Sequence, residues 1–146
     1  MIFPVDNYKI TSPYGLRKDP SKKFEEKIFH NGVDFVSLNG NRSVVAITDG
    51  VIIYDFDGYD DKQRWTSKKH SAGNMIIQSV RLDGETYYIR YLHLEENYVK
   101  TNTVVKEKDL LGVYGDVGYS FGAHLHVDIY DTAWKIVNPE ILFTEV

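Results

Sequence analysis

The sequence of 146 residues contains no cysteine, which excludes disulfide bonds and thiolate metal ligands. A metal site in this chain would therefore be built from His, Asp or Glu. The chain also lacks an excess of positive charge, because 17 Lys and Arg stand against 21 Asp and Glu and give a net charge of −4. That balance offers no electrostatic footprint for nucleic acid, and we expect no nucleic-acid partner.

Long apolar runs are missing as well. No stretch approaches the roughly 20 apolar residues of a membrane-spanning helix, so we expect no stable membrane insertion. Residues 1–15 lack the basic start and apolar centre of a secretory signal. A function outside a cytoplasm would need another route, or a signal removed earlier.

Helical periodicity is weak throughout; residues 19–30 could hold one helical turn, and residues 138–143 are expected to form a short closing turn. Aromatic residues are plentiful instead, with 11 Tyr, 7 Phe and 2 Trp, and such residues favour strands. We predict an all-β, mainly antiparallel fold with little helix, forming one domain over residues 1–146. The expected strands are 8–12, 43–47, 50–56, 73–82, 85–94, 109–115 and 123–130.

Turn residues organise these strands. Asp83-Gly84 lies between two strand-like runs and predicts a hairpin, because both residues can adopt positive φ. Residues 43–47 and 50–56 flank an expected tight turn at Thr48-Asp49-Gly50. The polar stretch 57–72 is longer than most loops, which is typical of functional or mobile segments.

Two histidines, His124 and His126, are separated by Leu125 near the end of the chain. Residues two apart on a strand point to the same face, so both imidazoles can converge on one site while Leu125 points the other way. Two histidines on a solvated strand face are the alternative.

His30 and Asp34 lie four residues apart in "HNGVD", and Gly32 between them lets the backbone bend. The even offset puts both side chains on one face of an extended segment, where an imidazole and a carboxylate can serve as zinc ligands. An Asp that simply hydrogen-bonds within a turn is the alternative.

His93 lies in the strand-like run "RYLHLEE". Strict alternation places His93 with Tyr91 on one face and Leu92 with Leu94 on the other. A histidine on such an aromatic face is often structural. His70, in the polar stretch, is interpreted as solvated.

Four histidines in three strand contexts match the needs of a catalytic zinc, which takes three protein ligands and leaves one open position. His30, Asp34 and one of the last two histidines would supply the ligands. His93 and the remaining histidine would lie beside the open position, where bond hydrolysis needs groups that move protons.

The motifs "HNGVD", "YLHL" and "HLH" occur in an order that resembles the lysostaphin/LytM-type zinc endopeptidases, which cut peptide cross-links in bacterial cell walls. The similarity covers roughly Ile10 to Leu142. It implies that His30, Asp34 and His126 bind Zn²⁺ and that His93 and His124 are catalytic. It also implies a mostly antiparallel β domain with a substrate groove across the sheet, for which residues 57–72 are a candidate wall.

The sequence departs from that family pattern at a few positions. A glycine is usual near Asn102, and Phe121 and Ala123 replace residues that are more often Thr and Pro. Asp128 stands where Glu is common. Because Asp128 lies two residues beyond His126 on the same face, it could orient a histidine, but the sequence alone favours an exposed acid at a strand end.

The resemblance predicts a zinc-dependent endopeptidase that hydrolyses peptide bonds in the stem peptides or cross-bridges of peptidoglycan, its expected partner. A non-catalytic wall-binding or regulatory module of the same fold is one alternative, and a zinc amidase that cuts a different wall bond is another. The expected location is the bacterial cell wall, reached by a phage-delivered or virion-associated protein, or by a mature secreted form. The sequence assigns no oligomeric state, and a monomer is the expectation.

Overall fold

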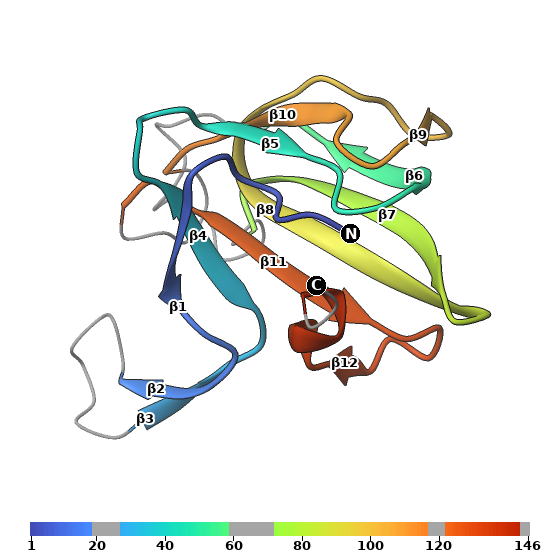
Figure 1. Cartoon of the computed structure of the whole chain (residues 1–146). Coiled ribbons are helices and arrows are strands. Elements are labelled where there is room, and N and C mark those ends of the chain that lie inside the picture. The colour runs from blue at the N-terminus through green and yellow to red at the C-terminus, as the bar shows by residue number, and fades with distance from the viewer. Residues whose placement is uncertain (19–26, 59–71, 117–121, 144–146) are drawn as a thin grey trace.

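The computed structural model describes residues 1–18, 27–58, 72–116 and 122–143 (Figure 1). Nearly all of their regular structure is β. The strands are β1 (Tyr8–Ser12), β2 (Gly15–Lys18), β3 (Lys27–His30), β4 (Val33–Ser37), β5 (Ser43–Val45), β6 (Gly50–Phe56), β7 (Asn74–Leu82), β8 (Glu85–Asn97), β9 (Val104–Val105), β10 (Leu110–Tyr114), β11 (Leu125–Tyr130) and β12 (Ile136–Val137). A short 3₁₀ helix, η3 (Pro139–Leu142), forms the expected closing turn, with Asn138 as its N-cap.

Ten of these strands form one antiparallel sheet, whose main path runs β1-β4-β11-β8-β7-β6-β9. β10 pairs with both β5 and β8, and β12 pairs with β11. β2 and β3 form a separate hairpin that projects away from the sheet at the lower left of Figure 1. The prediction of an all-β, mainly antiparallel fold is confirmed.

The central hairpin joins β7 and β8 through Asp83 and Gly84, whose φ angles are 50° and 81°. Positive φ at both central residues matches the right-handed twist of the strands, and the predicted hairpin is confirmed. β5 and β6, by contrast, flank residues 48–49 as expected but do not pair with each other. β5 pairs with β10, whereas β6 pairs with β7 and β9.

The hydrophobic core lies on one face of the central strands. Alternating residues of β8 and β11 pack there beneath the N-terminal segment, β5 and η3. The cluster includes Ile89, Tyr91, Val127, Ile129, Val5, Val44 and Leu142. The intervening residues of β11, His126 and Asp128, therefore face the opposite side of the sheet.

Some sequence-based expectations fall outside the described residues. Of the possible helical turn at 19–30, residues 27–30 form a strand and the remainder is not described. Residues 59–71, which hold most of the candidate groove wall and His70, also lie outside the described ranges. The groove itself stays a prediction. Among the described residues, no helix has the length and apolar character needed to cross a membrane.

Candidate metal centre

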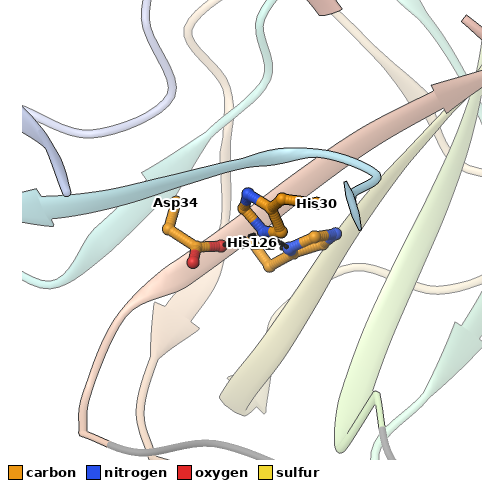
Figure 2. A group of neighbouring side chains, drawn as sticks. All are labelled: His30, Asp34 and His126. Atoms are coloured by element: carbon orange, nitrogen blue, oxygen red, sulfur yellow. Dashed lines mark hydrogen bonds and ion pairs between the residues drawn. The ribbon is translucent and has the colours of Figure 1, made fainter. Parts of the chain in front are cut away.

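Three potential metal-binding side chains converge at the junction of β3, β4 and β11 (Figure 2). The Nε2 atom of His30 lies 3.3 Å from Oδ1 of Asp34 and 3.2 Å from Nδ1 of His126. Nδ1 of His126 lies 3.0 Å from the same Asp34 oxygen. All three residues are buried, with exposed fractions of 4%, 7% and 7%. The structure thus brings together the three residues for which the sequence predicted metal binding.

His30 is held at the end of β3 by a backbone carbonyl. Its Nδ1 lies 3.0 Å from the carbonyl oxygen of Pro13. Because a carbonyl can only accept, Nδ1 must carry the hydrogen, and Nε2 then turns its lone pair toward Asp34 and His126. A hydrogen bond of this kind on the distal nitrogen fixes the orientation and tautomer of a metal-binding histidine.

Gly32 is required by the closeness of two chain segments. A Cβ atom built on Gly32 would lie 2.4 Å from the carbonyl oxygen of Val127 and 2.6 Å from Nε2 of His126. Its φ is not among the positive values in the described chain. The chain bends at Gly32, as the sequence indicated. The structure adds a spatial reason for this glycine: no side chain fits between the β3–β4 turn and His126.

His126 is anchored on its distal side by Asp128, so the interpretation that the sequence favoured, an exposed acid at a strand end, is wrong. Nε2 of His126 donates to Oδ2 of Asp128 at 3.0 Å, and Asp128 is fully buried. Asp128 also accepts two hydrogen bonds from Arg90, at 2.7 Å from Nε and 2.6 Å from Nη2. This bidentate pair positions the carboxylate and offsets its charge.

Sequence reasoning missed Arg90. Its contact with Asp128 depends on the register of β8 against β11, where these two residues lie directly opposite. A single charge inside the strand-forming run "YYIRYL" was the available signal, since a charge within a strand commonly has a partner.

The electrostatics of the cluster favour positive charge at its centre. Burial alone would raise the pKa of Asp34, but its close contacts with the His126 and His30 imidazoles hold that pKa far below its usual range. Burial alone would lower the pKa of His126, but its hydrogen bonds to Asp128 and Asp34 raise it to about 9. Both shifts have the same physical cause, which is that the carboxylates of Asp34 and Asp128 stabilise positive charge on the His126 imidazole.

His124 precedes β11 and lies on the same side as His126, as alternation predicted. Its Nδ1 lies 2.8 Å from the carbonyl oxygen of Gly122, so Nδ1 carries the hydrogen. Its Nε2 lies 3.7 Å from Oδ1 of Asp34. The side chain is 18% exposed, more than those of the three clustered residues. His124 thus borders the cluster at its more accessible side.

His93 also reaches this side of the sheet, against the alternation expected from the sequence. Its ring centroid lies 4.8 Å from that of His124 and 6.1 Å from that of His126. Tyr91 and Leu94 are both in the hydrophobic core instead. The predicted grouping of His93 with Tyr91, and of Leu92 with Leu94, is wrong.

A β-bulge causes this change of face. Between the pairs Asn74–Leu94 and Ile76–Tyr91, one residue of β7 opposes two residues of β8, Leu92 and His93. His93 adopts a φ of 64°, and its N–H donates to the carbonyl oxygen of Ala72. Bulges commonly re-aim a side chain next to a functional site. Here the bulge turns an imidazole out of the core and toward the cluster.

The donor set fits a zinc ion. Zinc prefers four ligands in a tetrahedron with bonds of about 2.0–2.1 Å to nitrogen and oxygen, which places neighbouring ligand atoms about 3.3 Å apart. The three observed separations of 3.0–3.3 Å match that edge. Two imidazoles with engaged distal nitrogens and one carboxylate also have the chemistry of a catalytic zinc site.

Comparisons with known proteins agree with this geometry. Residues 28–139 match the model of "Peptidase family M23". This range contains all five residues of the cluster and its border. The chain therefore belongs to peptidase family M23, a family of metallopeptidases.

A curated relative, the peptidoglycan DD-endopeptidase ShyA of Vibrio cholerae, is 31% identical over 87% of this chain and 26% of its own length. The chain spans about a quarter to a third of the length of the curated relatives it matches first.

Two solved structures share the fold. The catalytic domain of lysostaphin from Staphylococcus simulans has a TM-score of 0.71 and 26% identity, covering 96% of this chain and 95% of that domain. A zinc-containing peptidase from Vibrio cholerae has a TM-score of 0.69 and 29% identity over 93% of this chain and 37% of its own.

Proposed function

We propose that this chain is a zinc-dependent endopeptidase that hydrolyses peptide bonds in peptidoglycan, with zinc held by His30, Asp34 and His126. The observation that carries the proposal is the triangle of donor atoms 3.0–3.3 Å apart, bordered by two further histidines. The family and the relative named a peptidoglycan endopeptidase support the substrate class. The proposal takes residues 1–146 as one peptidase domain.

Bound zinc would supply Lewis acidity, which polarises a scissile carbonyl and makes water more acidic. The two bordering histidines would handle the protons and the developing charge. His124 is suited to accept a proton because its Nδ1–H is engaged by Gly122, which leaves Nε2 on the side of Asp34. His93, next to it, is suited to donate a hydrogen bond to the oxyanion of the transition state.

The alternatives from the sequence make different predictions. A non-catalytic module of the same fold has no need of a complete donor triangle or of two accessory histidines. The complete set therefore favours an enzyme. A zinc amidase would use the same donor set but release whole peptides from the glycan. The route to the wall, by phage delivery or as a mature secreted form, stays a prediction from the sequence.

Digestion of purified peptidoglycan tests the proposal. The zinc-loaded protein should release fragments in which mass spectrometry finds new amino and carboxyl ends within the peptides. Chelation should stop the release, and added zinc should restore it. Release of intact stem peptides would indicate an amidase instead. A protein that carries stoichiometric zinc but yields no new ends from several wall types would contradict the proposed activity.

A further inference from the structure

The face of the sheet that carries the candidate metal centre continues along β8 and β11 beyond it. Facing residues of the two strands are His126 with Leu92, Asp128 with Arg90, and Tyr130 with Tyr88. Directly opposed residues project to the same face, so Tyr88 and Tyr130 lie on the side of His126. Tyr130 lies four residues after His126 along β11, which corresponds to roughly 13 Å at about 3.3 Å per residue.

An aromatic cluster of Tyr88, Tyr130 and Trp134 lies at the end of this face that is farther from the metal centre. The ring of Trp134, from the turn between β11 and β12, stacks on Tyr88 at a centroid distance of 4.6 Å and an interplanar angle of 22°. It lies 5.8 Å from the ring of Tyr130. Trp134 is nevertheless 51% exposed. One indole face is thus covered and oriented by Tyr88, and a large part of the side chain remains in solvent.

The backbone at Trp134 is unfavourable for a bulky residue. Its φ is 58°, in the third position of a three-residue hairpin loop whose ends join at Asp131 and Lys135. That position commonly belongs to glycine, because it requires the left-handed conformation. A bulky residue there is an outlier with a cost of order 1–2 kcal/mol. The loop therefore carries a strained and exposed tryptophan where glycine would be the more stable choice.

The polar groups around the aromatic cluster can form hydrogen bonds, and their charges nearly cancel. The Tyr130 hydroxyl lies 3.2 Å from Nη2 of Arg90 and 3.4 Å from the amide nitrogen of Asn31. The Arg90 charge is offset by its bidentate pair with Asp128. Asn31 directly follows His30, so this polar edge connects the cluster to the metal centre.

A flat aromatic face beside hydroxyl and amide groups suits a neutral ring that presents C–H bonds on one side and polar substituents at its rim. Aliphatic C–H groups carry slight positive charge and pack on the negative face of an aromatic ring. N-acetylated sugars, which form the glycan strands of peptidoglycan, have this chemistry. A charged peptide would find no unpaired opposite charge among the groups just described.

We propose that Tyr88, Tyr130 and Trp134 form a binding platform for a sugar ring of the glycan strand to which the cleaved peptide is attached. The proposal rests on the proposed function for its choice of substrate. The platform would hold the glycan while the peptide extends along the strands toward the metal centre. Because Tyr88 fixes the indole in advance, little conformational freedom is lost on binding.

Binding of a sugar oligomer tests the platform without any turnover. The probe is a tetramer of β-1,4-linked N-acetylglucosamine, titrated into the zinc-loaded protein and followed by NMR chemical shifts. We expect saturable shifts at the Trp134 indole and a Kd that rises about five- to tenfold in Trp134→Gly, the size of one aromatic contact. Trp134→Phe should retain most of the affinity. Tyr98→Ala, which removes an aromatic residue of similar exposure (48%) elsewhere, should leave the Kd unchanged.

Trp134→Gly also separates binding from a structural role. Glycine relieves the strained backbone, so its free energy of unfolding should match or exceed that of Trp134→Ala. On intact peptidoglycan, Trp134→Gly should raise KM with little change in kcat, whereas on a sugar-free peptide of the same sequence both should stay at wild-type values. An equal loss on both substrates, or no oligomer binding in the wild type, would overturn the platform. Cleavage of neither substrate would instead overturn the proposed function.

Discussion

Two of the strands that bring histidines to the metal centre, β11 and β8, do so in different ways. β11 keeps an unbroken register against β8 from His126 to Tyr130, so residue parity alone decides which side chains face the cluster. β8 brings His93 to the metal centre only because a bulge at Leu92 and His93 turns the His93 side chain to the opposite face of the sheet. A regular strand thus places a side chain by pairing, and a bulged strand places it by a local backbone conformation.

The difference has consequences for what each position tolerates. His126 is fixed by hydrogen bonds at both ring nitrogens, to Asp128 and within the cluster. His93 depends on a positive φ that few side chains adopt readily. Substitutions on β11 should therefore act through lost partners, and substitutions at the bulge should also act through backbone strain.

The largest effect is expected on the regular strand. His126→Ala removes one of three proposed zinc ligands, and zinc affinity should fall by about 10³-fold, roughly a third of the apparent binding free energy of a structural zinc site. Peptidase activity at low zinc should be lost with it. Metal content after dialysis against a weak chelator measures the change. His124→Ala, two residues away on the same face, is the matched control and should keep its zinc while losing activity. Stoichiometric zinc in dialysed His126→Ala would remove its assignment as a ligand.

The second prediction compares the two accessory histidines directly. At position 93, glycine suits the positive φ and a β-branched residue does not, so His93→Gly should be more stable than His93→Val by about 1–2 kcal/mol. At position 124, where φ is not positive, His124→Gly should be no more stable than His124→Val. All four variants should lose about 10²–10⁴-fold in kcat, because each lacks a proton-handling or hydrogen-bonding group.

Urea unfolding of the zinc-free proteins measures these stabilities without the contribution of bound metal. Equal stability of the two variants at position 93 would show that the bulge does not constrain that residue. Wild-type kcat in any of the four would remove the catalytic role of that histidine.

The regular strand could be predicted from sequence and the bulge could not. Period-two alternation placed His124 and His126 on one face, with Leu125 in the core, and it placed Asp128 beside His126. The same rule failed for His93, because a bulge depends on how two strands pair, which no local pattern encodes.

Contacts between segments that are distant in the chain could not be predicted from the sequence either. The pairing of Arg90 with Asp128 requires the register of two strands, and the closeness of Gly32 to His126 requires their packing. Resemblance to the family could show that the usual glycine near Asn102 is absent, but it could not show which backbone conformation the chain adopts there. Asn102 itself adopts a φ of 74°, and asparagine is among the few residues that tolerate it.

The third prediction concerns the partner that fixes His126. Asp128→Asn leaves one oxygen to accept from both Arg90 and His126, so zinc affinity should fall about 10–100-fold. The free energy of unfolding should fall by about 3 kcal/mol, because Arg90 loses its counter-charge. The double variant Arg90→Met/Asp128→Asn should recover part of the stability and none of the zinc affinity. Wild-type zinc affinity in Asp128→Asn would show that orientation of His126 does not depend on this carboxylate.

The smallest effect is expected on the core side of β8, on the face of the sheet opposite the metal centre. Tyr91 accepts a hydrogen bond from the backbone N–H of Ile47 at 3.2 Å and donates one to Oε1 of Gln78 at 2.7 Å. Tyr91→Phe leaves both buried groups without that partner and should lower the free energy of unfolding by about 1–2 kcal/mol. Zinc content and kcat should stay at wild-type values. Tyr87→Phe, at a half-buried neighbouring position, should change stability by less than about 0.5 kcal/mol. A loss of zinc in Tyr91→Phe would mean that the core face and the metal face of β8 are coupled through the bulge, and the two faces could then no longer be treated as independent.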